Sequence, residues 1–267
     1  MGGREKSNTG SATHSDWFRR SLMTLVTAGG AGAERASNHT AFVVDQLGRA
    51  IVAGEYPAET MIPLDPDLCE MFGVSRTVVR EAKKTLIAKG MIQSKAKVGT
   101  HVRPADEWNM FDEDVLRWHA TARNPTRFYE ELYEIRMIFE PAAAAQAAGR
   151  VNQVDLDELN ALCDRLATAD NRTDFALADY EFHKQVLRLS GNRFLQSLGD
   201  LVQTALYSLF MAEHIGDFSE RRESVARRHR AIVSAIASGA QLDARDAMSR
   251  VIHDGYANVV MKGTVAS

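Results

Sequence analysis

The segment from Phe72 to Gly90, FGVSRTVVREAKKTLIAKG, constrains the fold more than any other part of the chain. Ser75 is a favoured helix N-cap residue and Gly90 a typical helix terminator, so one helix is predicted between them. Four apolar residues share one arc of this helix, with Ile87 as the misfit: Val78, Val79, Ala82 and Leu86. Five polar residues lie on the opposite arc: Arg76, Thr77, Arg80, Lys83 and Lys84. The helix is therefore predicted to pack by one face and to present a cationic one.

The charge of this segment contrasts with that of the whole chain. Five cations and one acid lie between Arg76 and Lys89, although the formal net charge of the protein is −3. Further cations follow at Lys95, Lys97 and Arg103, and the sequence after Pro104 is acidic overall. A strongly basic region within an acidic chain indicates two separate tasks.

The flanking segments predict a small domain over residues 39–103. A helix is expected from Thr40 to Val52, and a second one follows in which Asp65 is the candidate N-cap and Gly73 the terminator. After Gly90, MIQSK and THVRP predict a β-hairpin that turns near Lys97 to Gly99. Three short helices and a hairpin are typical of a winged helix-turn-helix.

A winged helix-turn-helix places its third helix in the DNA major groove, with the N-terminal residues of that helix at base edges. Arginine there can bond guanine O6 and N7 together, whereas lysines on the helix and the wing would contact phosphates. The predicted DNA contacts are Arg76, Thr77, Arg80, Lys83, Lys84, Lys95, Lys97 and Gly99. The alternative is a solvated helix face without a ligand, but the caps and the basic hairpin favour DNA.

Residues 40–103 also resemble the DNA-binding domain of GntR-type bacterial regulators. The resemblance lies in FGVSRTVVREA, then Leu86, Gly90 and Ile92, and finally Gly99, Thr100 and Val102. It implies that Arg76 and Arg80 read bases. Pro66 stands where many relatives carry an arginine, so the DNA contact of that arginine is not carried over.

The rest of the chain is predicted to be helical. Trp108, Phe111, Val115, Leu116 and Trp118 are expected to pack a connector, residues 104–122, onto one or both domains. Residues 123–264 are predicted to form an all-α domain, because helical periodicity recurs near 126–149, 153–169, 172–190, 192–213, 217–238 and 241–262. The predicted fold class is therefore mainly α, and residues 1–38 are predicted to be a disordered leader.

Four residues of the second domain have side chains that bind divalent metals. Asp179 and His183 are four apart, which places them on one face of a helix as half of a metal site. His229 and His253 lie in other amphipathic segments. Each histidine by itself could equally be a core or surface residue, and spacing does not show that the four converge.

This domain resembles the C-terminal ligand-binding domain of the FadR subfamily of GntR regulators, the FCD domain. The matching segments are Glu134–Ala144, Asp179–His183, Ser190–Asn192, His229–Ile232 and Val251–His253. The resemblance implies that Asp179, His183, His229 and His253 hold a divalent ion: zinc, with nickel or manganese as alternatives. It also implies that Arg136 and Asn192 face the effector, although an Arg136–Glu140 pair on the helix surface is the alternative. Arg228 stands where relatives often have a glutamate.

The leading hypothesis is a cytoplasmic, homodimeric transcriptional regulator that represses a catabolic operon, binds DNA and responds to a small carboxylate at the metal. The connector pattern W-N-x-x-D-x-D-V-L-x-W is similar to that of FadR-type regulators of sugar-acid catabolism, which favours a sugar acid as effector. Two alternatives stay open: a metal-dependent hydrolase and a sensor of the metal itself. Two distant cysteines fit a reducing cytosol, and no apolar run is long enough to span a membrane.

Overall fold

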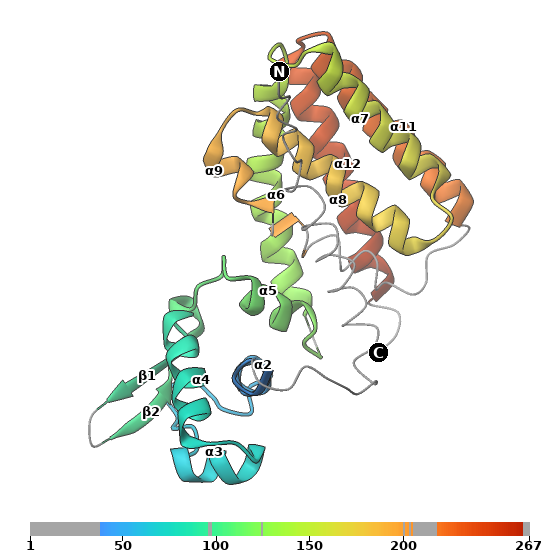
Figure 1. Cartoon of the computed structure of the whole chain (residues 1–267). Coiled ribbons are helices and arrows are strands. Elements are labelled where there is room, and N and C mark those ends of the chain that lie inside the picture. The colour runs from blue at the N-terminus through green and yellow to red at the C-terminus, as the bar shows by residue number, and fades with distance from the viewer. Residues whose placement is uncertain are drawn as a thin grey trace, which may run out of the picture. The chain divides into compact units, whose positions relative to one another are not determined.

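A computed structural model describes residues 38–95, 98–123, 125–199, 201–202, 204 and 218–263 (Figure 1). The chain divides into two compact units. The described residues up to Arg136, with those between 201 and 204, form the first unit. Met137–Gly199 and the described residues from Phe218 onward form the second. Residues 1–37 of the predicted leader lie outside the described residues, and its last residue, Asn38, begins α2.

The first unit is a winged helix-turn-helix, as predicted. Its helices are α2 (Asn38–Val52), α3 (Asp65–Phe72) and α4 (Arg76–Ala88), and its wing pairs β1 (Ile92–Lys95) with β2 (Gly99–Val102) in antiparallel register. The predicted N-cap of α3 is displaced by one residue, since Leu64 caps the helix and Asp65 begins it. Asp67 Oδ2 accepts the Leu64 N–H at 3.3 Å.

The wing has a third extended segment that the sequence pattern did not predict. Met61 forms a β-bridge with His101, and the Ile62 N–H donates to the Thr100 carbonyl at 3.0 Å. The Val102 N–H donates in turn to the Thr60 carbonyl at 3.0 Å. The chain entering α3 is therefore bonded to the wing, which fixes the start of α3 relative to the hairpin.

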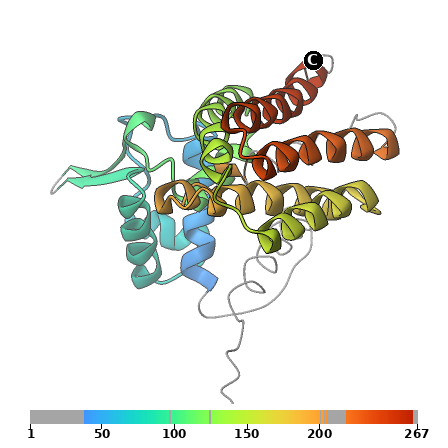
Figure 2. The same ribbon diagram turned by 90° about the horizontal axis from the view of Figure 1, so that it is seen from above.

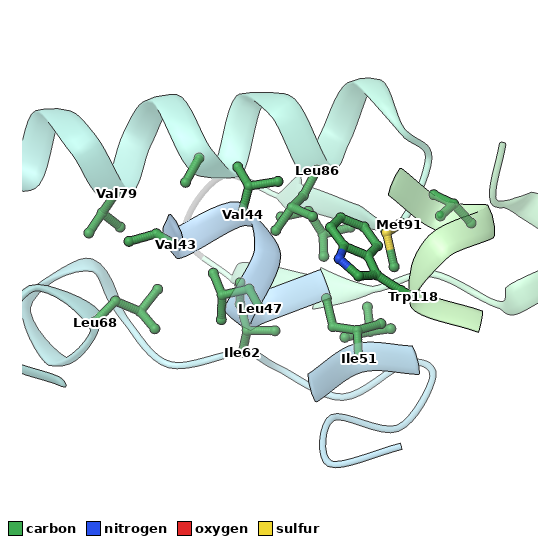
Figure 3. Close-up of a cluster of buried hydrophobic side chains, with 14 residues drawn as sticks. Val43, Val44, Leu47, Ile51, Ile62, Leu68, Val79, Leu86, Met91 and Trp118 are labelled. Atoms are coloured by element: carbon green, nitrogen blue, oxygen red, sulfur yellow. The ribbon is translucent and has the colours of Figure 1, made fainter. Parts of the chain in front are cut away.

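The connector packs into the core of the first unit. It contains a short 3-10 helix (Ala105–Glu107) and α5 (Glu113–Ala120). Trp118 is 1% exposed and lies in one cluster with Leu47, Leu86 and Met91 (Figure 3). The Trp118 ring leaves no room for a side chain at Gly48, where an added Cβ would meet it at 2.4 Å. Of the five apolar connector residues, only Phe111 is largely exposed, at 63%.

Ion pairs also bind the connector to the end of α4. The Lys89 ammonium lies 2.7 Å from Asp112 Oδ1 and 2.8 Å from Asp114 Oδ2, and its side chain is 10% exposed. Burial lowers the pKa of Lys89, but the hydrogen bonds that its ammonium donates to these two carboxylates raise it above its usual value overall. Lys89 is therefore a buried, paired residue of this unit, although it is one of the five cations between Arg76 and Lys89 in the sequence.

The second unit is all-α. Helix α6 (Thr126–Ala147) runs into it and is followed by α7 (Gln153–Thr168), α8 (Arg172–Leu189), α9 (Arg193–Gln196), α11 (Phe218–Ala237) and α12 (Gln241–Gly263). Five of these helices match the predicted segments to within two residues. The exception is the segment predicted at 192–213, where the structure gives the short α9 and residues 205–217 are not described. None of the described helices is long and apolar enough to cross a membrane.

The packing of α7, α8 and α11 positions the candidate metal ligands. Helix α7 packs against both α8 and α11, and α11 packs against α12 (Figures 1 and 2). Leu166 of α7, Ala178 of α8 and Ala226 of α11 form one buried cluster. Because small alanines let the helices approach closely, the residues just beyond Ala178 and Ala226 are brought together.

Candidate nucleic-acid interface and metal centre

The N-terminal half of α4 presents an exposed polar surface. Ser75 caps the helix as predicted, and its Oγ accepts the Val78 N–H at 3.4 Å. Arg76, Thr77 and Arg80 are exposed on the first turns. Since these are the positions that meet base edges in a helix-turn-helix, the side chains needed for base readout are accessible.

Lys83 is placed differently from the expectation that it contacts phosphate. It is 8% exposed, and its ammonium lies 2.7 Å from Asp65 Oδ1 and 3.5 Å from the Pro63 carbonyl. Lys84, the next residue, is 71% exposed and pairs with Glu81. A paired, buried ammonium is poorly placed to meet a phosphate, so Lys84 is the lysine that α4 offers to solvent.

The wing carries the remaining predicted contacts. Lys95 is exposed at the end of β1. Gly99 is the first residue of β2 and has a φ of +115°, a backbone conformation that residues other than glycine rarely adopt. Lys97 lies outside the described residues. Together with α4, the described cations open to solvent on this candidate surface are Arg76, Arg80, Lys84 and Lys95.

In the second unit, Asp179, His183 and His229 form a buried cluster. One ligand atom from each lies within 4.8 Å of the others. Asp179 Oδ1 is 2.9 Å from His229 Nε2 and 4.0 Å from His183 Nε2. The first distance joins α8 to α11, and the second confirms that the i, i+4 pair of α8 shares one face.

The hydrogen bonds of the two histidines fix which nitrogen faces the cluster. His229 Nδ1 lies 2.9 Å from the Val225 carbonyl, which can only accept, so Nδ1 donates and, in the neutral ring, Nε2 carries the lone pair. His183 Nδ1 lies 2.5 Å from Glu140 Oε2, and Glu140 is 1% exposed. A carboxylate behind a histidine is the usual outer support of a metal-binding imidazole.

The cluster has the donor set of a divalent metal site. His229 Nε2 is buried and makes no hydrogen bond with any group in the described part of the chain, despite its closeness to Asp179. The lone pair of a neutral imidazole and a carboxylate oxygen both accept, so their close approach in a buried site calls for a cation between them, either a proton on the ring or a metal ion. Two imidazoles and one carboxylate suit zinc, nickel or manganese.

Comparison with known proteins decides what these two units belong to. Residues 39–102 match the family model described as bacterial regulatory proteins, gntR family, and residues 131–254 match the FCD domain. The galactonate operon transcriptional repressor of Escherichia coli K12 is 33% identical over 200 residues, which cover 74% of this chain and 87% of that protein. The chain belongs to the GntR family of bacterial regulatory proteins.

A second relative of this GntR-family regulator differs from the first in its effect on transcription. The Glc operon transcriptional activator of Escherichia coli K12 is 26% identical over 229 residues, covering 79% of this chain and 88% of that protein. The family models make this chain a transcriptional regulator rather than a hydrolase, and both named relatives regulate transcription. One is a repressor and the other an activator.

A solved structure shares the fold. It is titled "Lar controls the expression of the Listeria monocytogenes agr system and mediates virulence", and it matches with a TM-score of 0.59 at 19% sequence identity. The match covers 87% of this chain and 99% of that one. At this level of identity the likeness concerns the fold alone.

His253, the fourth ligand implied by the family resemblance, is not brought into the cluster. It lies on α12 with an exposed side chain, and it is not part of the group formed by Asp179, His183 and His229. The neighbouring Asp254 forms an ion pair with Arg228 of α11, in which Arg228 Nε lies 3.4 Å from Asp254 Oδ2. Arg228, where relatives often have glutamate, therefore links α11 to α12 beside His253.

The two residues expected to face the effector have different surroundings. Arg136 is 6% exposed and Glu140 is 1% exposed, so the alternative of an ion pair on the helix surface is wrong. Asn192 caps α9, where its Oδ1 accepts the Phe194 N–H at 2.9 Å. This capping role accounts for Asn192 without an effector.

Two residues near the cluster were not singled out from the sequence. The sequence suggests Glu140 only as a partner of Arg136, because a glutamate 43 positions before His183 gives no local signal of their contact. Arg221 is half-buried on α11; burial lowers its pKa, and the charge of Asp179 raises it in opposition. By contrast, burial raises the pKa of the Cys163 thiol to about 12, which keeps it protonated and unsuited to metal binding.

Proposed function

We propose that this regulator binds a divalent metal ion through Asp179, His183 and His229 and senses a small carboxylate at that site. The observation that carries the proposal is the convergence of three ligand atoms within 4.8 Å in a buried cluster. When bound, the metal would supply coordination positions for an anionic oxygen of the effector.

The surrounding side chains have supporting roles in this proposal. Glu140 accepts from His183 Nδ1 and so keeps Nε2 of that ring directed at the ion. Val225, through its carbonyl, does the same for His229. Arg136, a buried guanidinium, would bind the carboxylate of the effector with its planar fork. His253, which lies outside the cluster in this structure, is proposed as a fourth ligand on the family resemblance alone.

We further propose that the protein acts in the cytoplasm as a homodimer that reads a two-part operator. Arg76, Thr77 and Arg80 would contact base edges, and Lys84, Lys95 and Lys97 would contact phosphates. Gly99 would allow the wing to approach the DNA backbone. The proposed consequence of effector binding is a shift between two arrangements of the paired heads, one of which binds the operator better.

The relatives guide the choice of effector and the sign of regulation. The galactonate operon repressor supports a sugar acid as the effector and repression of a catabolic operon as the output. Galactonate is therefore the first compound to test, with lactate as a smaller hydroxy acid.

Fluorescence anisotropy on the full-length protein tests the proposal. A duplex selected by the wild-type protein from a random library serves as operator, and zinc-loaded and chelator-treated protein are titrated with each acid. Arg80→Ala is expected to weaken binding of the selected duplex by about 1–3 kcal/mol, while unrelated DNA loses far less.

The outcomes separate the parts of the proposal. Release or tightening by one acid, present with zinc and absent after chelation, supports a carboxylate sensed at the metal. A response to chelator alone, with no effect of any acid, would instead favour a sensor of the ion. Retained metal binding in His253→Ala would remove His253 from the ligand set. If the wild type selects no sequence, the operator proposal fails.

A further inference from the structure

The first residue of α3, Asp65, contacts two cations of α4, the third helix of the helix-turn-helix unit, with its two carboxylate oxygens. Oδ1 lies 2.7 Å from the ammonium of Lys83, and Oδ2 lies 3.6 Å from Nε of Arg80. Both cations belong to α4, whereas Asp65 belongs to the helix before the turn. A single carboxylate therefore spans the two helices of the helix-turn-helix.

The two cations differ in how far they are open to DNA. The Lys83 side chain is 11% exposed, and that of Arg80 is 69% exposed. Lys83 also reaches the Pro63 carbonyl, at 3.5 Å. Lys83 thus holds Asp65 in place from the inside, while Arg80 is guided by the carboxylate and remains accessible.

We propose that Asp65 is a positioning residue for base readout by Arg80. This inference rests on the proposed role of Arg80 at base edges. With Nε turned toward Asp65, the two terminal nitrogens of Arg80 remain available for guanine O6 and N7. A free arginine samples many rotamers, and restraint before binding reduces what must be ordered on the DNA.

The charge of Asp65 has a second effect, which lowers both affinities and leaves their ratio unchanged. A carboxylate beside α4 repels phosphates and weakens binding to any duplex, whatever its sequence. Binding to the correct sequence gains from the oriented arginine, so the carboxylate raises the ratio between specific and nonspecific affinity.

Asp65→Asn alone is an incomplete test, because it leaves the buried Lys83 ammonium without its carboxylate and could unfold the unit. Lys83→Met keeps the contact of Asp65 with Arg80, whereas Lys83→Met with Asp65→Asn removes it without leaving that ammonium behind. Comparison of these two variants isolates the effect of Asp65 on Arg80. Asp67→Asn is the matched control, since it removes a carboxylate of the same turn that accepts the Leu64 N–H.

The measurement is the ratio of affinities for the duplex selected by the wild type and for an unrelated duplex of equal length, across a salt series. Thermal unfolding checks that each full-length variant is folded. Adding Asp65→Asn to Lys83→Met is expected to lower the ratio by about fivefold or more, the low end of one bidentate contact. Asp67→Asn should leave the ratio unchanged.

The double-mutant cycle with Arg80→Ala decides whether Arg80 mediates the effect. Once Arg80 is alanine, removing Asp65 should no longer change the ratio. The inference is overturned if Asp65→Asn lowers both affinities by the same factor, or if its effect on the ratio persists without Arg80. A wild type that selects a sequence but shows either result contradicts this inference alone, whereas a wild type that selects none also contradicts the proposed function.

Discussion

The two candidate sites are both built around one aspartate that faces two basic side chains, and they differ in burial. Asp65 faces Lys83 and Arg80 with a side chain that is 30% exposed. Asp179 faces His229 and His183 with a side chain that is 9% exposed. Water can solvate Asp65 in part, whereas Asp179 depends almost wholly on its protein neighbours and, in the proposed function, on a bound cation.

This difference in burial sets what each aspartate can do. A half-exposed carboxylate can orient a mobile side chain and release it when DNA competes, because the cost of separation is small in a well-solvated place. A buried carboxylate beside two imidazoles, each with a protein partner at Nδ1, has few other partners to exchange with. The aspartate of the first unit is thus suited to exchange its partners, and that of the second unit is suited to hold an ion.

The largest expected effect is the loss of metal binding in Asp179→Asn. Removing the anionic ligand should lower zinc affinity by more than about 100-fold, beyond what loss of an outer-shell partner costs. Competition with a chromophoric chelator measures the affinity. His39, exposed on α2, supplies the matched control as His39→Ala. Unchanged zinc affinity in Asp179→Asn would mean that the cluster is not the metal site.

The next effect is that of Glu140→Gln. An amide cannot offer His183 Nδ1 the same charged acceptor, so the ring is held less firmly and is less basic. Zinc affinity is expected to fall by about 10–100-fold while the helical content is kept. The same chelator competition, with circular dichroism as the check on folding, measures both. Full affinity in the variant would reduce Glu140 to a packing role.

Adjacent lysines on α4 give a smaller and sharper contrast. Lys83→Met breaks the buried pair with Asp65 and is expected to cost about 1–2 kcal/mol of unfolding free energy in urea. Lys84→Met should change stability by no more than about 0.5 kcal/mol. It should instead reduce the salt dependence of DNA binding by about one phosphate contact. Equal stability of the two variants would contradict the structural role of Lys83.

The smallest effect concerns pH. The hydrogen bond from Lys83 lowers the pKa of Asp65 below 3.8, against a weaker opposite effect of burial, and Arg80 contributes further. The stabilisation is therefore complete above pH 3.8 and is lost as the pH falls through the folded-state pKa. Urea unfolding from neutral to acidic pH should show wild type and Asp65→Asn converging at low pH. A constant difference between them would contradict this linkage.

Local sequence signals predicted much of the fold. The cap at Ser75, the glycines that end helices and the apolar arc of α4 all reflect backbone chemistry within a few residues, so they could be interpreted without knowing the fold. The pairing of Asp179 with His183 is equally local, because residues four apart share one face of a helix. The helix is capped by Leu64, one residue before the predicted cap, because local signals locate a helix boundary only to within a residue or so.

Tertiary packing determined which side chains are buried and which contact one another, and a local periodic pattern contains neither. A helical wheel places Lys83 and Lys84 on the same polar arc, but only the position of α3 determines that one is buried against Asp65 and the other is open. His229 and Glu140 reach the cluster from α11 and α6, far from His183 in sequence, and His253 does not reach it. The sequence by itself determined the helices, the family resemblance and the types of side chain. The packing of one helix on another determined which of those side chains meet, since contact depends on distances that no local pattern contains.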